Sequence, residues 1–334
     1  MPRMITGIKP TGRPHLGNYL GMIRPALDLA RSAGAGDGAP LFFVPDYHAL
    51  TITPPPAELR AAVLDLTATL IAFGLDPDRD ILYRQSDLPE VCELTWILGC
   101  TCAKGLLNRA HAYKAAVADN LAHGRQADHG IGFGVYSYPV LMAADILLHR
   151  AAAVPVGRDQ RQHVEIARDV AESFNRAYGP VLVVPEPVVD ERMMTVPGLD
   201  GRKMSKSYGN QLALAAPPDE IRRWVSRIVT DSRPPAEPKE PDTILALYRG
   251  VAPDAEARDL ERRYRTGGVG YAEAKALLAD AIERLVGPAR ERHAELMADP
   301  AGLRDILARG AGRARESAAG TIAAVRAATG LGWA

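Results

Sequence analysis

Short apolar segments alternate with longer segments of helical periodicity through about the first two thirds of this chain, and this alternation restricts the fold more than any other feature. The apolar runs predict strands at 4–6, 41–44, 81–85, 154–156 and 181–184. Helices are predicted between them at 18–30, 57–73, 87–98 and 157–178, the third with Ser86 as its N-cap. Such alternation is typical of an α/β fold, a parallel sheet wrapped by helices.

From residue 217 onward only helical spacing remains, and breaks at 250–253, 267–270 and 287–288 divide this part into about five helices. We therefore expect an α/β domain over 1–212, a helical domain over 213–300, and C-terminal helices over 301–334 that can pack back on the first domain. Arginines are frequent between 222 and 265. They predict either a nucleic-acid surface or a solvated face balanced by nearby acidic residues.

Charge and cysteine content narrow the class of protein. The chain has 40 Lys and Arg against 40 Asp and Glu, so a nucleic-acid partner would need a local basic surface. Cys92, Cys100 and Cys102 are too few for a disulfide framework, which favours a reducing compartment, and we expect them to be small core residues rather than metal ligands. No secretion signal or membrane span is recognisable, so we expect a cytoplasmic protein without membrane contact.

The segment from Thr6 to Tyr19 carries the first candidate for chemistry. It follows a strand and enters a helix, so its glycines and backbone N–H groups converge where a phosphate binds at a helix N-terminus. His15 and Asn18 can donate to phosphate oxygens, and Gly17 lets a nucleotide approach the backbone. Neither the dinucleotide-binding glycine pattern nor the Walker pattern is present, and taken alone this turn is more typical of a structural role.

A second motif, Lys203-Met204-Ser205-Lys206-Ser207, follows a glycine-rich stretch. Two lysines three residues apart in a loop can close over a polyphosphate and neutralise the charge of a leaving group. Together, His15-x-Gly17-Asn18 and this loop resemble the two signatures of class I aminoacyl-tRNA synthetases. Segments 138–148, 154–163, 46–51 and 230–232 are similar to the tryptophanyl-tRNA synthetase family.

The resemblance implies a Rossmann-like catalytic domain followed by a helical anticodon-binding region. It implies that L-tryptophan is activated with ATP, with Mg²⁺ accompanying the nucleotide, and is then transferred to tRNA(Trp). It also implies a homodimer, with helices around 57–107 at the interface, and no structural metal. Tyrosyl enzymes, which usually carry Tyr at the position of Ile5 and vary the lysine loop, and a non-catalytic tRNA-binding paralogue remain alternatives.

Asp145 is the candidate for choosing the amino acid. At helical spacing Tyr138, Met142 and Asp145 lie near one face, as a pocket wall requires. A carboxylate only accepts hydrogen bonds and an indole N–H only donates, so Asp145 can recognise tryptophan in an apolar slot. A buried aspartate paired with an arginine of the same chain is the alternative.

The family pattern extends these assignments residue by residue. Around the amino acid it implies Tyr138, Met142, Gln160, His48, Gly7, Ile5, Val154 and Val156, with Gln160 open to a purely structural place at a helix start. Around ATP it implies Lys9, Pro10, Thr11, His15, Gly17, Asn18, Gly157, Arg158, Asp159, Met193, Lys203, Met204, Ser205, Lys206 and Ser207. Catalysis falls to Gly17, Asn18, Lys203 and Lys206.

The chain departs from the family pattern at several of these positions. Bacterial enzymes usually have Gln in place of Lys9, and a second lysine two residues after Lys114, where this chain has Ala116. Since both positions belong to the nucleotide side of the pocket, we predict that Lys9 replaces the missing cation. Ile5, His15 and Arg158 also differ from the usual residues.

Overall fold

A computed structural model describes residues 4–10, 12–32, 38–151, 153–156, 161–189 and 196–332, without the side chains of 153, 155, 156, 188 and 189. Its main sheet contains parallel strands in the order β1 (Ile5–Gly7), β2 (Leu41–Val44) and β3 (Ile81–Arg84). Ile5 pairs with Leu41, and Leu41 with Ile81. The strands predicted at 4–6, 41–44 and 81–85 are confirmed to within one residue at each end.

A second parallel pair is formed by β4 (Ala153–Val156) and β5 (Glu186–Val189). The strand predicted at 181–184 is wrong. Asn175 Oδ1 accepts hydrogen bonds from the backbone N–H groups of Val181 and Leu182 at 3.1 and 2.8 Å, and its Nδ2 donates to the Leu182 carbonyl. The side chain thus occupies backbone groups that a strand would need, and pairing begins only at Glu186.

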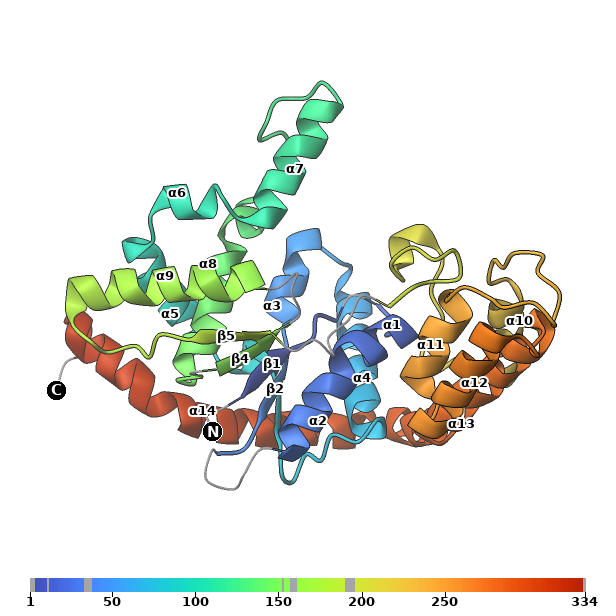
Figure 1. Cartoon of the computed structure of the whole chain (residues 1–334). Coiled ribbons are helices and arrows are strands. Elements are labelled where there is room, and N and C mark those ends of the chain that lie inside the picture. The colour runs from blue at the N-terminus through green and yellow to red at the C-terminus, as the bar shows by residue number, and fades with distance from the viewer. Residues whose placement is uncertain are drawn as a thin grey trace.

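Helices cover the sheet and connect its strands (Figure 1). In the first part of the chain they are α1 (Leu16–Asn18), a π-helix (Tyr19–Ile23), α2 (Arg24–Ser32), α3 (Asp46–Ala49), α4 (Pro56–Ala72), α5 (Glu90–Thr101), α6 (Lys104–Leu107), α7 (His111–Ala122), α8 (Phe133–Leu148) and α9 (Arg161–Tyr178). Ser86 is not the N-cap of α5, because its hydroxyl donates to Asp46 Oδ2 and the helix begins at Glu90. Helix α7 projects from the body of the molecule (Figure 1).

The second part of the chain is helical, as predicted. It contains α10 (Pro218–Ser226), α11 (Thr243–Val251), α12 (Asp254–Thr266), α13 (Tyr271–Ala298) and α14 (Pro300–Thr329). The break predicted at 287–288 is wrong, since α13 continues through Pro288. Gly287 has no Cβ to collide with the proline ring, which lowers the steric cost of a proline inside the helix. The chain breaks instead at Asp299, whose side chain caps α14.

Helix α14 runs along the base of the molecule from the helical region to the sheet (Figure 1). A Cβ at Gly310 would overlap the backbone carbonyl of Leu82, so the helix touches β3 directly. Arg313 donates to the carbonyls of residues 77–80, and Arg326 forms a bidentate pair with Glu93. The last helix therefore completes the packing of β3.

Strand β2 separates two apolar cores. Phe42 and Val44 face a cluster shared with the helical region, whereas Leu41 and Phe43 face a cluster shared with α5, α8, α9 and α14. Burial on both faces is typical of a parallel strand between helical layers. The prediction that the cysteines are core residues is wrong for Cys92 and Cys100, which are exposed. No helix among the described residues is long and apolar enough to cross a membrane.

Candidate functional site

A cleft of about 810 Å³ opens at the carboxyl ends of β1 and β2. Parallel α/β sheets bind their ligands at this edge. The cleft brings together most of the described residues that the sequence predicts for the site. On the amino-acid side these are Ile5, Gly7, His48, Tyr138, Met142, Asp145 and Val154, and on the nucleotide side Lys9, His15, Gly17, Asn18, Lys203, Met204 and Ser205.

The N-terminal turn is held by a reciprocal cap. Asn18 Oδ1 accepts from the His15 backbone N–H at 3.0 Å, and His15 Nδ1 accepts from the Asn18 backbone N–H at 3.3 Å. Because Nδ1 accepts, a neutral His15 ring carries its proton on Nε2. Burial, followed by the charge of Lys206, lowers the pKa of His15 to about 4. His15 is therefore a neutral donor at physiological pH.

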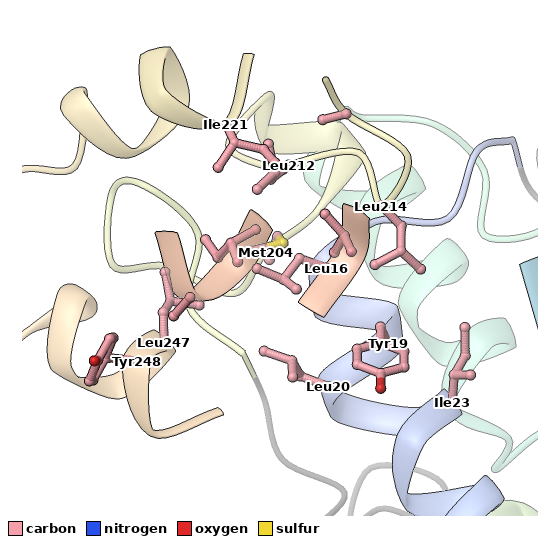
Figure 2. Close-up of a cluster of buried hydrophobic side chains, with 14 of the residues drawn as sticks. Leu16, Tyr19, Leu20, Ile23, Met204, Leu212, Leu214, Ile221, Leu247 and Tyr248 are labelled. Atoms are coloured by element: carbon pink, nitrogen blue, oxygen red, sulfur yellow. The ribbon is translucent and has the colours of Figure 1, made fainter. Parts of the chain in front are cut away.

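The N-terminal turn and the lysine loop, 187 residues apart in the chain, are in contact. The backbone N–H of Gly17 donates to Met204 Sδ at 3.1 Å, and a Cβ at Gly17 would lie 3.1 Å from the Met204 Cβ. The Leu16 N–H also donates to the Leu212 carbonyl at 2.9 Å. Figure 2 shows the Met204 side chain beside Leu16 in the apolar core. The two motifs thus share one wall of the cleft.

Asn210 organises the lysine loop. Its Oδ1 accepts from the Ser205 N–H at 2.9 Å, and its Nδ2 donates to the Lys203 carbonyl at 3.1 Å and to Asp200 Oδ1 at 2.7 Å. These bonds hold the ends of the loop and leave Lys203 along the cleft. Sequence reasoning missed Asn210, which no pattern distinguishes from other loop asparagines.

Lys206, Ser207 and Pro10 are the described site predictions that do not line the cleft. Lys206 lies beside the N-terminal turn, where a Cβ at Gly12 would be 2.9 Å from its Nζ. Gly12 has φ +72°, which also favours glycine. Burial lowers the pKa of Lys206. Lys206, the second lysine of the loop, therefore lies against the N-terminal turn and does not line the cleft in this structure.

Asp145 is fully buried at the other end of the cleft. Gln85 Nε2 donates to both of its carboxylate oxygens at 2.9 Å, and His48 Nε2 donates to Oδ2 at 3.0 Å. Gln85 Oε1 accepts from the Tyr47 N–H at 3.2 Å, which fixes the orientation of its amide. Burial raises the pKa of Asp145, and the bonds from His48 and Gln85 oppose this shift. Its partners are an amide and an imidazole rather than the guanidinium of the alternative prediction.

Aromatic and aliphatic side chains enclose the space next to Asp145. The Phe43 ring lies against Gly7, where any Cβ would overlap it, and stacks on Tyr83 with 5.8 Å between ring centroids. The Tyr138 hydroxyl lies 2.8 Å from His163 Nε2, and both residues line the cleft. Burial raises the pKa of Tyr138, so the phenol stays neutral. This end of the cleft is an apolar slot with one acidic group.

Lys9 lies between the two ends of the cleft. Its Nζ donates to Thr51 Oγ1 at 3.0 Å, and the Thr51 hydroxyl donates to the His48 carbonyl at 2.8 Å. Burial lowers the pKa of Lys9. The ammonium group is therefore a partly desolvated cation at the cleft. The sequence predicts that this cation replaces the lysine that is missing two residues after Lys114.

Several predicted residues lie outside the described part of the chain. They are Thr11, Gly157, Arg158, Asp159, Gln160, Met193 and the side chain of Val156. Sequence reasoning missed others that the structure places at the cleft or behind it, above all Gln85, Phe43, Thr51 and His163. For Gln85 a signal existed, since polar residues directly after a parallel strand collect at the ligand-binding edge.

Comparisons with known proteins agree with this geometry. Residues 1–287 match the family of class I tRNA synthetases for W and Y. The chain is 49% identical to the tryptophan–tRNA ligase of Pseudomonas aeruginosa over 98% of its own length and 74% of that protein. It is 48% identical to the ligase of Bordetella parapertussis, over 99% of this chain and 73% of that one.

A solved structure confirms the fold class. Tryptophanyl-tRNA synthetase from Campylobacter jejuni, complexed with ADP and tryptophan, superposes with a TM-score of 0.85 at 38% identity and covers 98% of this chain and 100% of that one. The chain therefore belongs to the class I tRNA synthetases for tryptophan and tyrosine, and within them to the tryptophan–tRNA ligases.

Proposed function

We propose that this ligase activates tryptophan in the cleft at the carboxyl edge of the sheet, with the indole at Asp145 and ATP along the N-terminal turn and the lysine loop. One observation carries the proposal: a buried carboxylate, a helix N-terminus and the cations Lys9 and Lys203 open onto one cavity. The C. jejuni synthetase, similar along its whole length, holds tryptophan and ADP.

Asp145 has the acceptor capacity that indole recognition needs. A carboxylate offers about four lone-pair sites, and Gln85 and His48 take three of them. The fourth accepts the indole N–H in this proposal. A site built around one buried polar bond rejects ligands that lack the group by about 10⁴- to 10⁵-fold, so phenylalanine is excluded without editing.

The nucleotide side supplies neutral donors and positive charge. The His15 Nε2–H, the Asn18 amide and the backbone at Gly17 hold the phosphates. The tryptophan carboxylate oxygen forms a bond to the α-phosphorus as the bond to the pyrophosphate oxygen breaks. Lys203 and Lys206 stabilise the charge on that leaving group, which requires the loop to bring Lys206 round from its place behind the turn.

The remaining predicted site residues, several of which lie outside the described part of the chain, complete the proposal. We assign Gln160, with Tyr138, Met142 and His48, to the ammonium and carboxylate end of tryptophan, and Val154 and Val156 to the ring slot. Gly157, Arg158 and Asp159 are assigned to the ribose, and Met193 to the adenine. The backbone of Pro10 and Thr11 and the hydroxyls of Ser205 and Ser207 are assigned to the phosphates.

Mg²⁺ belongs to the nucleotide substrate in this proposal. Within the described ranges there is no group of three His, Cys, Asp or Glu side chains that could hold a metal ion, and the carboxylate that lines the cleft, Asp145, is already bonded to Gln85 and His48. These side chains therefore do not fit a divalent ion that is permanently bound to the protein.

The second step transfers tryptophan to the 3′-terminal ribose of tRNA(Trp), whose anticodon we assign to the helical region 213–300. Of the arginines between 222 and 265, six lie in ion pairs, as a solvated face predicts: Arg222, Arg233, Arg249, Arg262, Arg263 and Arg265. Arg223, Arg227 and Arg258 are exposed without an ion pair among the described residues. We assign these three arginines to contacts with tRNA phosphates.

We further propose that the ligase is a cytoplasmic homodimer joined through the helices of 57–107. Trp96 on α5 supports this assignment, because 76% of it is exposed and tryptophan is enriched at protein–protein interfaces. Replacement of Trp96 by Glu is expected to give monomers in sedimentation velocity, and an unchanged mass would contradict this interface.

Amino-acid-dependent exchange of pyrophosphate into ATP tests the activity directly. We expect exchange with tryptophan and background levels with tyrosine or phenylalanine. Exchange with tyrosine alone would identify the tyrosyl sibling, and exchange with none of the three would indicate a non-catalytic tRNA-binding paralogue.

A further inference from the structure

The C-terminal helix reaches the back of the tryptophan slot through a chain of hydrogen-bonded side chains, of which the first is half-buried and the other two are buried. Ser317 Oγ on α14 lies 3.1 Å from His149 Nδ1, and His149 Nε2 lies 3.1 Å from the Tyr83 hydroxyl. The rings of His149 and Tyr83 are fully buried. Three elements that are distant in sequence, α14, the end of α8 and β3, are therefore joined inside the protein.

Both walls of the slot depend on this chain. Tyr83 supports the Phe43 ring by stacking, and Phe43 in turn occupies the space beside Gly7 at the cleft. His149 caps α8 four residues after Asp145, so the two side chains project from the same face of the helix. A shift of His149 would move the carboxylate, and a shift of Tyr83 would move the ring opposite it.

We propose that Ser317, acting through His149 and Tyr83, is a positioning residue for the tryptophan slot. The inference rests on the slot proposed above. It gives α14 a role in substrate binding, because this helix continues from α13 of the helical region, with only Asp299 between them, to the floor of the amino-acid site. A buried hydrogen-bond chain holds its members in one arrangement as long as every link is made.

Other contacts of α14 anchor the helix without reaching the slot. Arg313 binds the carbonyls of residues 77–80 at the start of β3, and Gly310 touches the backbone of Leu82. These contacts remain when the Ser317 hydroxyl is removed. The effect of that removal should therefore be expressed in tryptophan binding rather than in detachment of the helix.

The test compares Ser317→Ala with Thr321→Val in the full-length ligase. Thr321 lies one turn further along α14, is fully buried whereas Ser317 is half-buried, and its hydroxyl has no hydrogen-bond partner in the part of the chain that the structure describes. Pyrophosphate exchange gives KM for tryptophan, KM for ATP and kcat. We expect Ser317→Ala to raise KM for tryptophan by about three- to tenfold, with KM for ATP within about twofold of wild type. Thr321→Val should change neither.

A merely structural role predicts a different result: a lower melting temperature and fewer active sites by titration, with both KM values unchanged. That result would overturn the proposal. Ser317→Thr keeps the hydroxyl and should restore KM for tryptophan. If Ser317→Ala yields no folded protein, Tyr83→Phe removes the hydroxyl at the other end of the chain, and it must raise KM for tryptophan by a similar factor.

A double-mutant cycle tests whether Ser317 and Tyr83 act through one hydrogen-bond chain or independently of each other. If Ser317→Ala and Tyr83→Phe act through the same chain, the double variant should be no worse than the more severe single variant. Multiplied effects would overturn the proposal. A null result for Ser317→Ala, with a large effect of Asp145→Asn, refutes the chain alone, whereas a null result for Asp145→Asn refutes the slot.

Discussion

Replacing Asp145 by Asn tests the recognition of tryptophan most directly. The amide that replaces the carboxylate keeps one oxygen and gains an N–H₂ group. Gln85 donates to both carboxylate oxygens at 2.9 Å and cannot turn its amide, because the Tyr47 N–H holds its oxygen. In Asp145→Asn the new N–H₂ group must therefore face at least one other hydrogen-bond donor. The one side-chain oxygen that remains must accept from Gln85, His48 and the indole N–H.

The size of the effect follows from the number of acceptors lost. A hydrogen bond to a charged, desolvated group contributes about 1.5–3 kcal/mol, and the indole N–H loses such a partner. This free energy corresponds to a fall in kcat/KM for tryptophan of about 10- to 150-fold. KM for ATP should stay within about twofold, because the described hydrogen bonds of Asp145 go to Gln85 and His48 rather than to residues assigned to the nucleotide.

The assay is tryptophan-dependent pyrophosphate exchange on protein whose fold is verified by circular dichroism. Asp242→Asn is a matched control, since Asp242 is a partly buried carboxylate that caps α11 and does not line the cleft. It should lower stability and leave kcat/KM unchanged. A loss of less than about threefold in folded Asp145→Asn, about 0.7 kcal/mol, would refute the assignment of the indole to this carboxylate.

Three further predictions concern the nucleotide side and the sheet. Lys9→Gln should raise KM for ATP by more than about twofold in the exchange assay, and a smaller change would count against Lys9 as a replacement cation. NMR titration of His15 should give a pKa of about 4, and Lys206→Gln should raise it. Because this value lies below the ordinary 6.5, the stability that neutral His15 contributes is complete above pH 6.5 and is lost as the pH falls towards 4. Urea unfolding should show this loss in wild type but not in His15→Gln. Gly310→Ala should lower the free energy of unfolding by about 1–3 kcal/mol through overlap with β3, whereas Gly312→Ala, with open space around it, should raise it by about 0.4–1 kcal/mol. Equal effects of the two alanines would show that α14 does not pack as described.

Local patterns in the sequence predict the parts of the fold that local physics controls. Strand β2 is an unbroken apolar run because both of its faces are buried, and its bounds are predicted without error. The face shared by Tyr138, Met142 and Asp145 follows from helical spacing, and all three line the cleft. The pattern of residues within one helix or strand was sufficient in each case.

Predictions fail where a particular side-chain contact, near or distant in sequence, decides the outcome. Asn175 captures the backbone of 181–182 and prevents a strand that the apolar pattern favours. Gln85 acquires its role only because Asp145, 60 residues later in the chain, is brought against it. Lys206 lies behind the N-terminal turn, although its motif suggests a place in the cleft. The contacts of Gln85 and Lys206 depend on the whole topology rather than on any window of sequence.

Because α14 is the last helix to be synthesised, its packing against β3 affects how the ligase folds during translation. The helix begins at Pro300, so a ribosome has translated nearly all of the chain before this segment can emerge. Until then β3, the edge strand of the sheet, lacks the helix that packs directly against it, and a nascent chain exposes apolar side chains of this core. Chains released early would keep every residue of the catalytic motifs and still be targets for chaperones and proteases.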